Sequence, residues 1–194
     1  MDHNAFLSHI RNFVQLSEAE AESILSVVRH RKYRKGQYVV QAGDICKEQS
    51  FVLSGCLKVY QVDQNGKEHV VAFAIENWWT GDLGSFIAQK PADYNVQCLE
   101  DSELIQFPFE HMEELYDKVP VLERFFRLHI QRSYVAAQRR VVDRMSIPAK
   151  ELYLQFADKY PELNQRIPQY LIASYLGITP QFLSKIRREL SGAK

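Results

Sequence analysis

The chain has 194 residues, 46% of them hydrophobic, which is enough to bury a substantial core in one large or two small domains. Its 24 Lys and Arg balance its 24 Asp and Glu, so the net charge by itself gives no sign of a nucleic-acid partner. The charge is nevertheless divided by region. Residues 1–129 hold 13 cations against 19 anions (−6), whereas residues 130–194 hold 11 against 5 (+6).

Three cysteines, Cys46, Cys56 and Cys98, are odd in number and widely spaced, which argues against a disulfide framework and against a zinc or iron–sulfur site. Cys56 and Cys98 could be oxidised if they lie close in space, but a free cysteine is more often a small buried hydrophobe. The N-terminal stretch breaks its apolar residues with charges every few positions, which is unlike a signal peptide or a membrane span. We therefore expect a soluble cytoplasmic protein with no membrane partner and no metal.

The N-terminal 28 residues predict two short amphipathic helices. Apolar residues recur at helical spacing from Phe6 to Val14 and again from Ile24 to Val28. Between them, Ser17 is followed three residues later by Glu20, which is the spacing of a capping box. The second helix is therefore expected to begin directly after Ser17.

The next block, up to Pro108, is rich in Val, Tyr and Phe and is punctuated by glycines about every ten residues, which predicts an antiparallel β-barrel or sandwich. The sequence "DQNGKE" lies between two alternating runs and predicts a hairpin, with Asn65 and Gly66 both at positive φ in a tight turn. Hence the first domain is expected to be a β-barrel flanked by helices.

After Pro108 the pattern becomes helical. A short helix is expected over 108–119, a long one over about 120–144, a break at Pro148 and one further helix over 149–163. The long helix would span about 37 Å, which exceeds one small domain, so we interpret its apolar stripe as a dimer seam. A core helix packed on its own barrel is the alternative. The expected seam residues are Leu122, Phe126, His129, Ser133, Ala136 and Ala137.

The C-terminal stretch "IPQYLIASYLGITPQFLSKIRREL" predicts a helix-turn-helix. The first helix would run from Pro168 to Tyr175, Gly177 would lie in the turn, and Thr179 would cap a second helix that begins with Pro180. Ala173 lets the two helices cross closely. The second helix leaves polar side chains for DNA, and the expected DNA-binding residues are Thr179, Gln181, Ser184, Lys185, Arg187 and Arg188. A helical hairpin with a solvated basic face is the alternative.

This order of parts resembles the family of the catabolite activator protein and the FNR-type regulators over essentially the full chain. The resemblance rests on "KGQYVVQAGD", "SFVLSGCLKVY", "GDLGSF" and the helix-turn-helix. It implies an α+β fold with an N-terminal double-stranded β-helix or jelly-roll barrel of the cyclic-nucleotide-binding type, a long dimerisation helix and a C-terminal reading head. Three segments are expected, over residues 1–118, 119–145 and 146–194.

The resemblance also places an effector pocket at Gly81, Asp82, Leu83, Ala92 and Asp93. In cyclic-AMP-binding relatives, an Arg followed by Ser or Thr about eleven residues after the first glycine grips the cyclic phosphate. Here that count reaches Ala92 and Asp93, and a phosphate buried beside a carboxylate without a guanidinium is electrostatically adverse. We therefore expect an unknown small effector or none, and not cyclic AMP.

Two further expectations follow from positions at which this sequence differs from the family that it resembles. The sequence ends shortly after Leu190, where relatives continue with a β-hairpin wing, so backbone contacts to DNA are expected from Arg139, Arg140, Arg144 or Arg166. An iron–sulfur sensor would need clustered cysteines, and a haem sensor would need an axial ligand, for which only His69 is a candidate by elimination.

The resemblance implies a homodimeric transcription regulator that binds a two-fold-symmetric operator, with RNA polymerase as a further partner. The alternative is a ligand-binding or protein-interaction sensor with secondary DNA binding, which Trp78 and Trp79 motivate because exposed indoles often line pockets. Catalysis is not expected: no catalytic motif is found, and "GDLGS" is expected to lack the helix-opening context of a phosphate loop.

Overall fold

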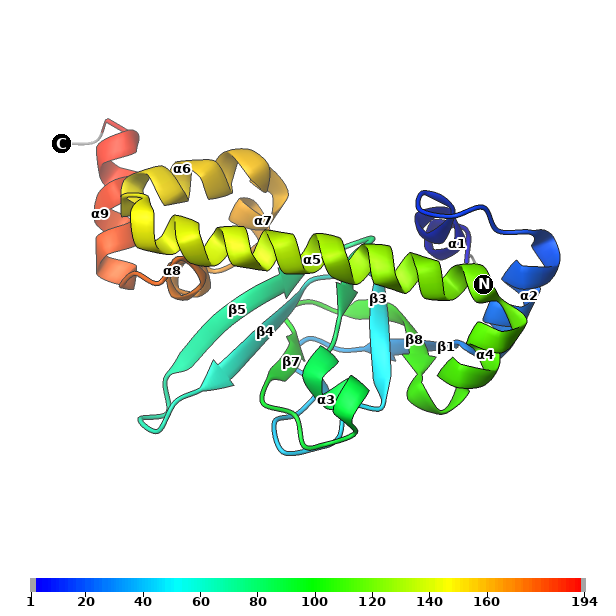
Figure 1. Ribbon diagram of the computed structural model, residues 1–194. Coiled ribbons are helices and arrows are strands. Elements are labelled where there is room, and N and C mark those ends of the chain that lie inside the picture. The colour runs from blue at the N-terminus through cyan, green and yellow to red at the C-terminus, as the bar shows by residue number, and fades with distance from the viewer. Residues whose placement is uncertain (1–2, 193–194) are drawn as a thin grey trace. The chain divides into compact units, whose positions relative to one another are not determined.

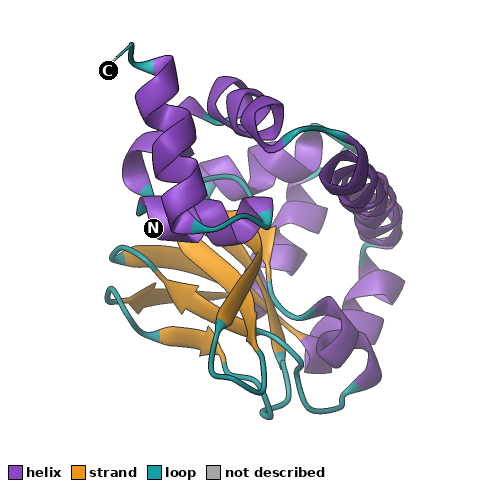
Figure 2. Cartoon of the chain, turned by 90° about the vertical axis from the view of Figure 1, so that its left-hand side faces the viewer, coloured by secondary structure: helices purple, strands orange, loops and turns teal. Residues whose placement is uncertain are grey.

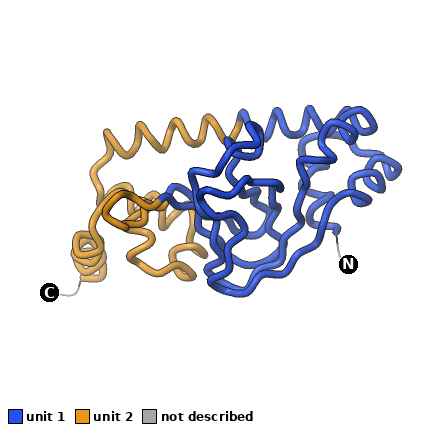
Figure 3. The backbone as a smooth tube through the Cα atoms, turned by 90° about the horizontal axis from the view of Figure 1, so that it is seen from below, with its two compact units in different colours: residues 1–61, 71–131 blue, residues 62–70, 132–194 orange. Residues whose placement is uncertain are grey.

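The computed structural model describes residues 3–192. The chain forms two compact units (Figure 3), one made of residues 1–61 and 71–131 and the other of residues 62–70 and 132–194. These units differ from the three expected segments in two ways. The long helix is shared between the units and does not form a segment of its own, and the tip of a β-hairpin belongs to the C-terminal unit.

Unit 1 begins with the two predicted helices, α1 (Asn4–Arg11) and α2 (Glu18–Val27). Ser17 caps α2 through the expected capping box, since its hydroxyl accepts from the Glu20 N–H while the Glu20 carboxylate accepts from the Ser17 N–H. Both helices turn apolar side chains into the core, where Phe6, Ile10 and Ile24 are fully buried. The local sequence signals therefore predicted both helices correctly.

The β-rich block forms two four-stranded sheets (Figures 1 and 2), in the orders β1-β8-β3-β6 and β2-β7-β4-β5. The strands are β1 (Arg29–Tyr33), β2 (Tyr38–Val40), β3 (Glu48–Ser54), β4 (Leu57–Val62), β5 (Glu68–Ala74), β6 (Trp79–Thr80), β7 (Asn95–Cys98) and β8 (Ser102–Pro108). Strands far apart in the sequence pair antiparallel, with Arg29 opposite Gln106 and Leu57 opposite Cys98. This jelly-roll-like arrangement confirms the predicted α+β fold with a β-barrel of non-local pairing.

The β4–β5 hairpin is confirmed, but its turn differs from the prediction. Gly66 has φ +79°, whereas Asn65 is not among the residues of positive φ. The reason is the Asp63 carboxylate, which accepts from the N–H groups of Asn65 and Lys67 and so stabilises a wider turn. Only one residue then needs the left-handed conformation.

Between β6 and β7 the chain forms a short helix, α3 (Leu83–Ala88), that the sequence reading did not expect. The view that "GDLGS" lacks a helix-opening context was therefore wrong. Asp82 is the N-cap of α3, and its carboxylate accepts from the Ser85 N–H at 2.9 Å. An acidic residue followed three positions later by serine was the signal for this cap.

Unit 1 ends with a 3-10 turn at Phe109–His111, α4 (Met112–Lys118) and the first half of α5 (Pro120–Ser146). The long helix is confirmed. Its first turns enter the core, where Leu122 and Phe125 are fully buried and Phe126 is 9% exposed. Trp79 packs edge-on against Phe51 and Phe126, so the indole is part of an aromatic core.

Unit 2 contains the second half of α5, then α6 (Ala149–Lys159), α7 (Pro161–Arg166), α8 (Gln169–Leu176) and α9 (Pro180–Leu190). One helix was expected over 149–163, but the chain breaks at Tyr160 because Pro161 cannot donate an N–H to continue α6 and instead begins α7. The hairpin tip joins this unit through Ser174. Its hydroxyl donates to the Glu68 carbonyl oxygen (2.9 Å) and accepts from the Val70 N–H (3.0 Å).

All three cysteines are buried free thiols. Burial raises the pKa of the Cys46 and Cys98 thiols above their ordinary value of 9.0. Both side chains belong to the hydrophobic core of unit 1. The reading of cysteine as a small buried hydrophobe therefore fits this fold.

The turn between β3 and β4 predicts a sharp sensitivity at Gly55. Gly55 has φ +104°, and an added Cβ would overlap the Ser102 side chain and lie 2.8 Å from the Asp101 carbonyl oxygen. We expect Gly55→Ala to lower the free energy of unfolding by about 3 kcal/mol or more, measured by urea denaturation. Gly66→Ala is the matched control. Gly66 also has positive φ but has nothing within 4 Å of an added Cβ, so it should cost only about 1 kcal/mol. Equal losses in the two variants would contradict the predicted clash.

The raised thiol pKa values predict slow alkylation of the folded protein. With a raised pKa, less thiolate is present at pH 7.5 than for an exposed cysteine, and the thiolate is the reactive form. Iodoacetamide labelling followed by mass spectrometry should be roughly tenfold or more slower in buffer than in urea, and its rate should keep rising with pH beyond the range in which the labelling of an exposed cysteine levels off. Rapid labelling of Cys46 or Cys98 in the folded state at pH 7.5 would contradict this prediction.

Candidate nucleic-acid interface and candidate effector site

The predicted effector residues meet around the carboxylate of Asp82. Asp82 is 4% exposed, and its Oδ2 accepts from the backbone N–H groups of Asp93 (2.9 Å) and Tyr94 (3.1 Å). Its Oδ1 accepts from the Ser85 N–H. The structure therefore brings Asp82 and Asp93 together as expected, but the contact to Asp93 is made by its backbone, while the Asp93 side chain is exposed.

A second set of hydrogen bonds ties α3 to the loop between β2 and β3. The Ser85 hydroxyl donates to the Lys90 carbonyl oxygen (2.5 Å) and accepts from the Cys46 N–H (2.9 Å). Ala92 is buried, and its N–H donates to the Asp44 carbonyl oxygen while its carbonyl oxygen accepts from the Gly43 N–H. The segments around residues 43–46, 82–90 and 92–94 thus form one hydrogen-bonded assembly.

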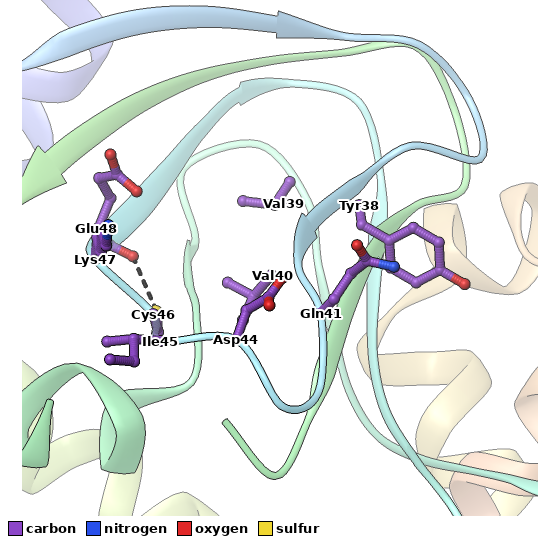
Figure 4. Close-up of a pocket in the computed structure, with 9 residues that line it drawn as sticks. All are labelled: Tyr38, Val39, Val40, Gln41, Asp44, Ile45, Cys46, Lys47 and Glu48. Carbon is purple, nitrogen blue, oxygen red and sulfur yellow. Dashed lines mark hydrogen bonds between the residues drawn. The ribbon is translucent and has the colours of Figure 1, made fainter. Parts of the chain in front are cut away.

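A surface hollow of about 180 Å³ lies next to this assembly (Figure 4). It is lined by residues 38–41 and 44–48, among which Val40 and Cys46 are buried and Ile45 is exposed. None of the five predicted effector residues lines it. Leu83 is 38% exposed on α3, and Gly81 packs beside the Gln49 side chain.

The electrostatics of the Asp82 site are unlike those of a phosphate site. Every hydrogen bond that Asp82 makes through its side chain comes from a backbone N–H, and in the described part of the chain no Lys or Arg side chain pairs with it. A second anion here would meet the carboxylate without a compensating cation, which is unfavourable in a buried site. The geometry thus adds to the sequence argument against cyclic AMP.

Other sensor chemistries find little support in the residues described. No group of three or more His, Cys, Asp or Glu side chains within residues 3–192 is arranged to hold a metal ion. His69 lies at the surface, where its Nε2 is 2.8 Å from the Asp63 carboxylate and the pair closes the hairpin turn. Hydrogen bonding from His69 lowers the pKa of Asp63. His69 therefore stabilises the hairpin turn through its contact with Asp63.

The helix-turn-helix is built as predicted. Gly177 ends α8 with φ +75°, and the Thr179 hydroxyl caps α9 by accepting from the Phe182 N–H at 3.2 Å. Ala173 is fully buried where the helices meet. The junction is closed by the buried side chains of Leu171, Ile172, Leu176, Leu183 and Ile186.

The outer face of α9 carries the predicted DNA-binding side chains. Leu183 and Ile186 point into the unit, whereas the polar side chains around them are exposed: Gln181, Ser184, Lys185, Arg187 and Arg188. Thr179 is also exposed but uses its hydroxyl as the cap. The Lys150 ammonium lies 3.7 Å from the Glu189 carboxylate, which neutralises the acidic residue nearest this face. The helix consequently presents amide, hydroxyl and cationic groups together.

Two of the arginines expected to contact the DNA backbone also contact α8 and the turn that follows it. The Arg140 guanidinium lies 5.4 Å from the Tyr175 ring centre, and the Arg144 side chain packs against Gly177 and donates to the Ser174 carbonyl oxygen at 3.5 Å. Arg139 is exposed and Arg166 is half-buried. Arg139 and Arg144 are therefore the two exposed members of the set.

The expected dimer seam needs correction at two positions. Leu122 is fully buried and Phe126 nearly so in the core of unit 1, where they are unavailable to a partner, and His129 stacks on Phe125 with the rings 5.9 Å apart. Ser133 and Ala136 are exposed and Ala137 is half-buried. The exposed side chains of Ile130, Tyr134, Val141 and Met145, with the half-buried Ala137 between them, follow the spacing four, three, four and four, and we call this set the α5 stripe. Val135 and Val142 are also exposed and lie beside it.

Sequence reasoning missed Ser85, Tyr94 and the loop residues Asp44 and Cys46. Ser85 could have been found as the third residue after an Asp cap. The other three contribute backbone groups, which carry no residue-type signal. Among the described residues, no helix is both long and apolar enough to cross a membrane.

Comparison with known proteins places these observations in a family. Residues 30–119 match the cyclic nucleotide-binding domain family. The fumarate and nitrate reduction regulatory protein of Vibrio cholerae is 25% identical over 187 residues, covering 88% of this chain and 72% of that protein. The protein of the same name from Escherichia coli K12 is 25% identical over 185 residues, with the same coverage.

Solved structures share the fold. The c-di-GMP-responsive global regulator CLP of Xanthomonas campestris superposes with a TM-score of 0.75 at 14% identity, over 91% of this chain and 92% of that one. The catabolite activator protein of Thermus thermophilus gives a TM-score of 0.59 at 20% identity, over 93% and 86%. Likeness at this identity speaks for the fold alone. With the domain match and the regulatory relatives, it shows that residues 30–119 form a cyclic nucleotide-binding domain and that the whole chain is similar to the Crp/Fnr regulators.

Proposed function

We propose that the chain is a DNA-binding transcription regulator of the Crp/Fnr type that acts as a homodimer on a two-fold-symmetric operator. The observation that carries the proposal is the exposed polar face of α9, held by a buried apolar face and a capped N-terminus. The regulatory relatives support the same reading, because the described fold matches theirs over most of the chain. The proposal involves no catalysis.

Two kinds of contact are expected along α9. Gln181 and Ser184 lie toward its N-terminal end, where an amide can pair with both edge atoms of adenine in the major groove. Lys185, Arg187 and Arg188 can reach guanine or phosphate oxygens, and the +6 charge of residues 130–194 provides a wider attraction to the DNA backbone. Base preference and affinity are thus assigned to different residues of one helix.

The α5 stripe is the proposed dimer surface. Its apolar side chains repeat at coiled-coil spacing, and Tyr134, Val141 and Met145 are 62%, 57% and 84% exposed in the single chain. Large apolar side chains in such a row favour contact with the same helix of a second copy. A two-fold dimer would then present two α9 helices to two half-sites about one helical turn apart.

The alternative, a sensor whose DNA binding is secondary, loses part of its support. Trp79 was one of the two indoles that motivated it, and its ring lies in the aromatic core of unit 1. Trp78 is also packed against that core. Contact with RNA polymerase and a cytoplasmic location are part of the proposed role as a regulator.

The DNA-reading role predicts distinct effects of two substitutions. Once an operator has been selected from random DNA, Gln181→Ala should relax the preference at one base pair, a loss of about 1–3 kcal/mol of discrimination. Lys185→Ala should weaken binding to all sequences and lower the salt slope by about one. The variant makes one phosphate contact fewer, so its binding releases fewer counterions. Fluorescence anisotropy at several salt concentrations measures both.

Lys118→Ala is the matched control, since Lys118 is an exposed cation in unit 1 that pairs with Glu114. It should leave affinity and salt slope unchanged. The proposal fails if the purified protein shows no sequence preference, or if affinity does not fall with rising salt.

The α5 stripe predicts that Val141→Asp separates the dimer, because a carboxylate would be buried at the seam without a partner. Sedimentation equilibrium should show a dimer dissociation constant raised by roughly tenfold or more. Val142→Asp is the control: Val142 is 60% exposed, like Val141, but lies off the stripe. A stronger effect at Val142 than at Val141 would show that a different face of α5 forms the seam.

A further inference from the structure

We propose that the Asp82 carboxylate is a built-in ligand of the barrel: it occupies the anion-binding position formed by the backbone of residues 93 and 94 and closes that site without any effector. The proposal goes beyond the DNA-reading role and does not depend on it, because every contact involved lies in unit 1.

Both oxygens of the Asp82 carboxylate accept hydrogen bonds from backbone N–H groups. Oδ2 accepts from two successive backbone N–H groups, those of Asp93 and Tyr94, and Oδ1 accepts from the Ser85 N–H. Successive N–H groups that converge on one point form a concave donor site suited to an anion. With Asp82 only 4% exposed, that donor site is filled from within the chain.

Energetics explain why these donors and this carboxylate need one another. A buried carboxylate without a cation is stable only when N–H groups satisfy its oxygens, and each buried N–H that loses its acceptor costs free energy in turn. Among the described residues, the Asp82 carboxylate accepts its side-chain hydrogen bonds from these three N–H groups alone. An external phosphate would have to displace the carboxylate or lie beside it.

The closed site is coupled to the neighbouring loop. Ser85, which is one of the carboxylate's partners, and Ala92, which precedes the other two, hydrogen-bond to the backbone of residues 43–46. Asp82 therefore holds the segment 92–94 against α3 while Ala92 holds the β2–β3 loop. We infer that this barrel adopts its closed arrangement in the absence of a ligand at this position.

Chemical rescue tests the proposal. Asp82→Ala removes the carboxylate and leaves the three N–H groups without an acceptor, so the Tm of the full chain should fall by about 5–10 °C. Sodium formate, which is the size of the missing group, should restore roughly half of that loss or more by mass action, whereas sodium chloride at the same ionic strength should not. A third series with sodium phosphate measures, through the Tm of the Asp82→Ala variant, whether the vacated site also binds a larger anion.

Asp93→Ala is the matched control. It removes the same charge from the same segment, but its side chain is exposed and its backbone N–H is kept. It should leave the Tm nearly unchanged and show no specific gain from formate. If formate stabilises the Asp93 variant as much as the Asp82 variant, or fails to stabilise the Asp82 variant more than chloride does, the proposal is overturned.

Two measurements keep the proposal testable if Asp82→Ala does not fold. In the wild-type protein, hydrogen exchange should show the Asp93 and Tyr94 amides protected, whereas fast exchange at both would contradict the closed site. Calorimetric titration of wild-type protein with cyclic AMP should give no heat of binding at micromolar concentrations. Micromolar binding that is lost on changing residues 92–94 would show that the site takes an external phosphate after all. Loss of DNA binding alone, with the Tm and rescue results as expected, would count against the proposed function and leave this inference standing.

Discussion

The burial of Leu122, Phe125 and Phe126 in the core of unit 1 is the constraint on which the functional reading depends. Each large apolar side chain contributes about 1.5–3 kcal/mol when fully buried, so these three hold the first turns of α5 firmly. Because α5 continues to Ser146 as one helix, its second half carries an apolar stripe that is left without cover in the single chain. The same helix thus stabilises the barrel at one end and carries the proposed dimer surface at the other.

The barrel of unit 1 encloses a buried carboxylate, that of Asp82. Its two sheets and the glycine-rich connection to α3 bury an acidic side chain, Asp82, whose carboxylate accepts hydrogen bonds from the chain's own backbone. The inference that the site is closed follows from hydrogen-bond satisfaction, since the donors that could receive an anion already have one. A regulator built in this way would take its signal from a surface other than the Asp82 site.

Sequence patterns predicted those elements whose signals are local. The Ser17 capping box, the Gly177 turn and the Thr179-Pro180 entry of α9 all appear as expected, because each depends on residues within a few positions. Local reading failed where two signals competed. At Asn65 the nearby Asp63 carboxylate changed the turn, and at Tyr160 the following proline divided one expected helix into two.

The sequence by itself determined the family, the α+β architecture and the exposed polar face of α9, because periodicity, caps and turn residues are local properties of the chain. Only the tertiary structure decided which part of α5 is buried, since its first turns with Leu122 and Phe126 and its second half with Tyr134 and Val141 are both apolar and both have helical spacing. It also decided the partners of Asp82. Two of these are backbone N–H groups eleven and twelve residues away, and they become neighbours of Asp82 only when the chain folds back at the end of α3. Backbone donors look the same at every position of a sequence, so their convergence on one carboxylate is visible only in three dimensions.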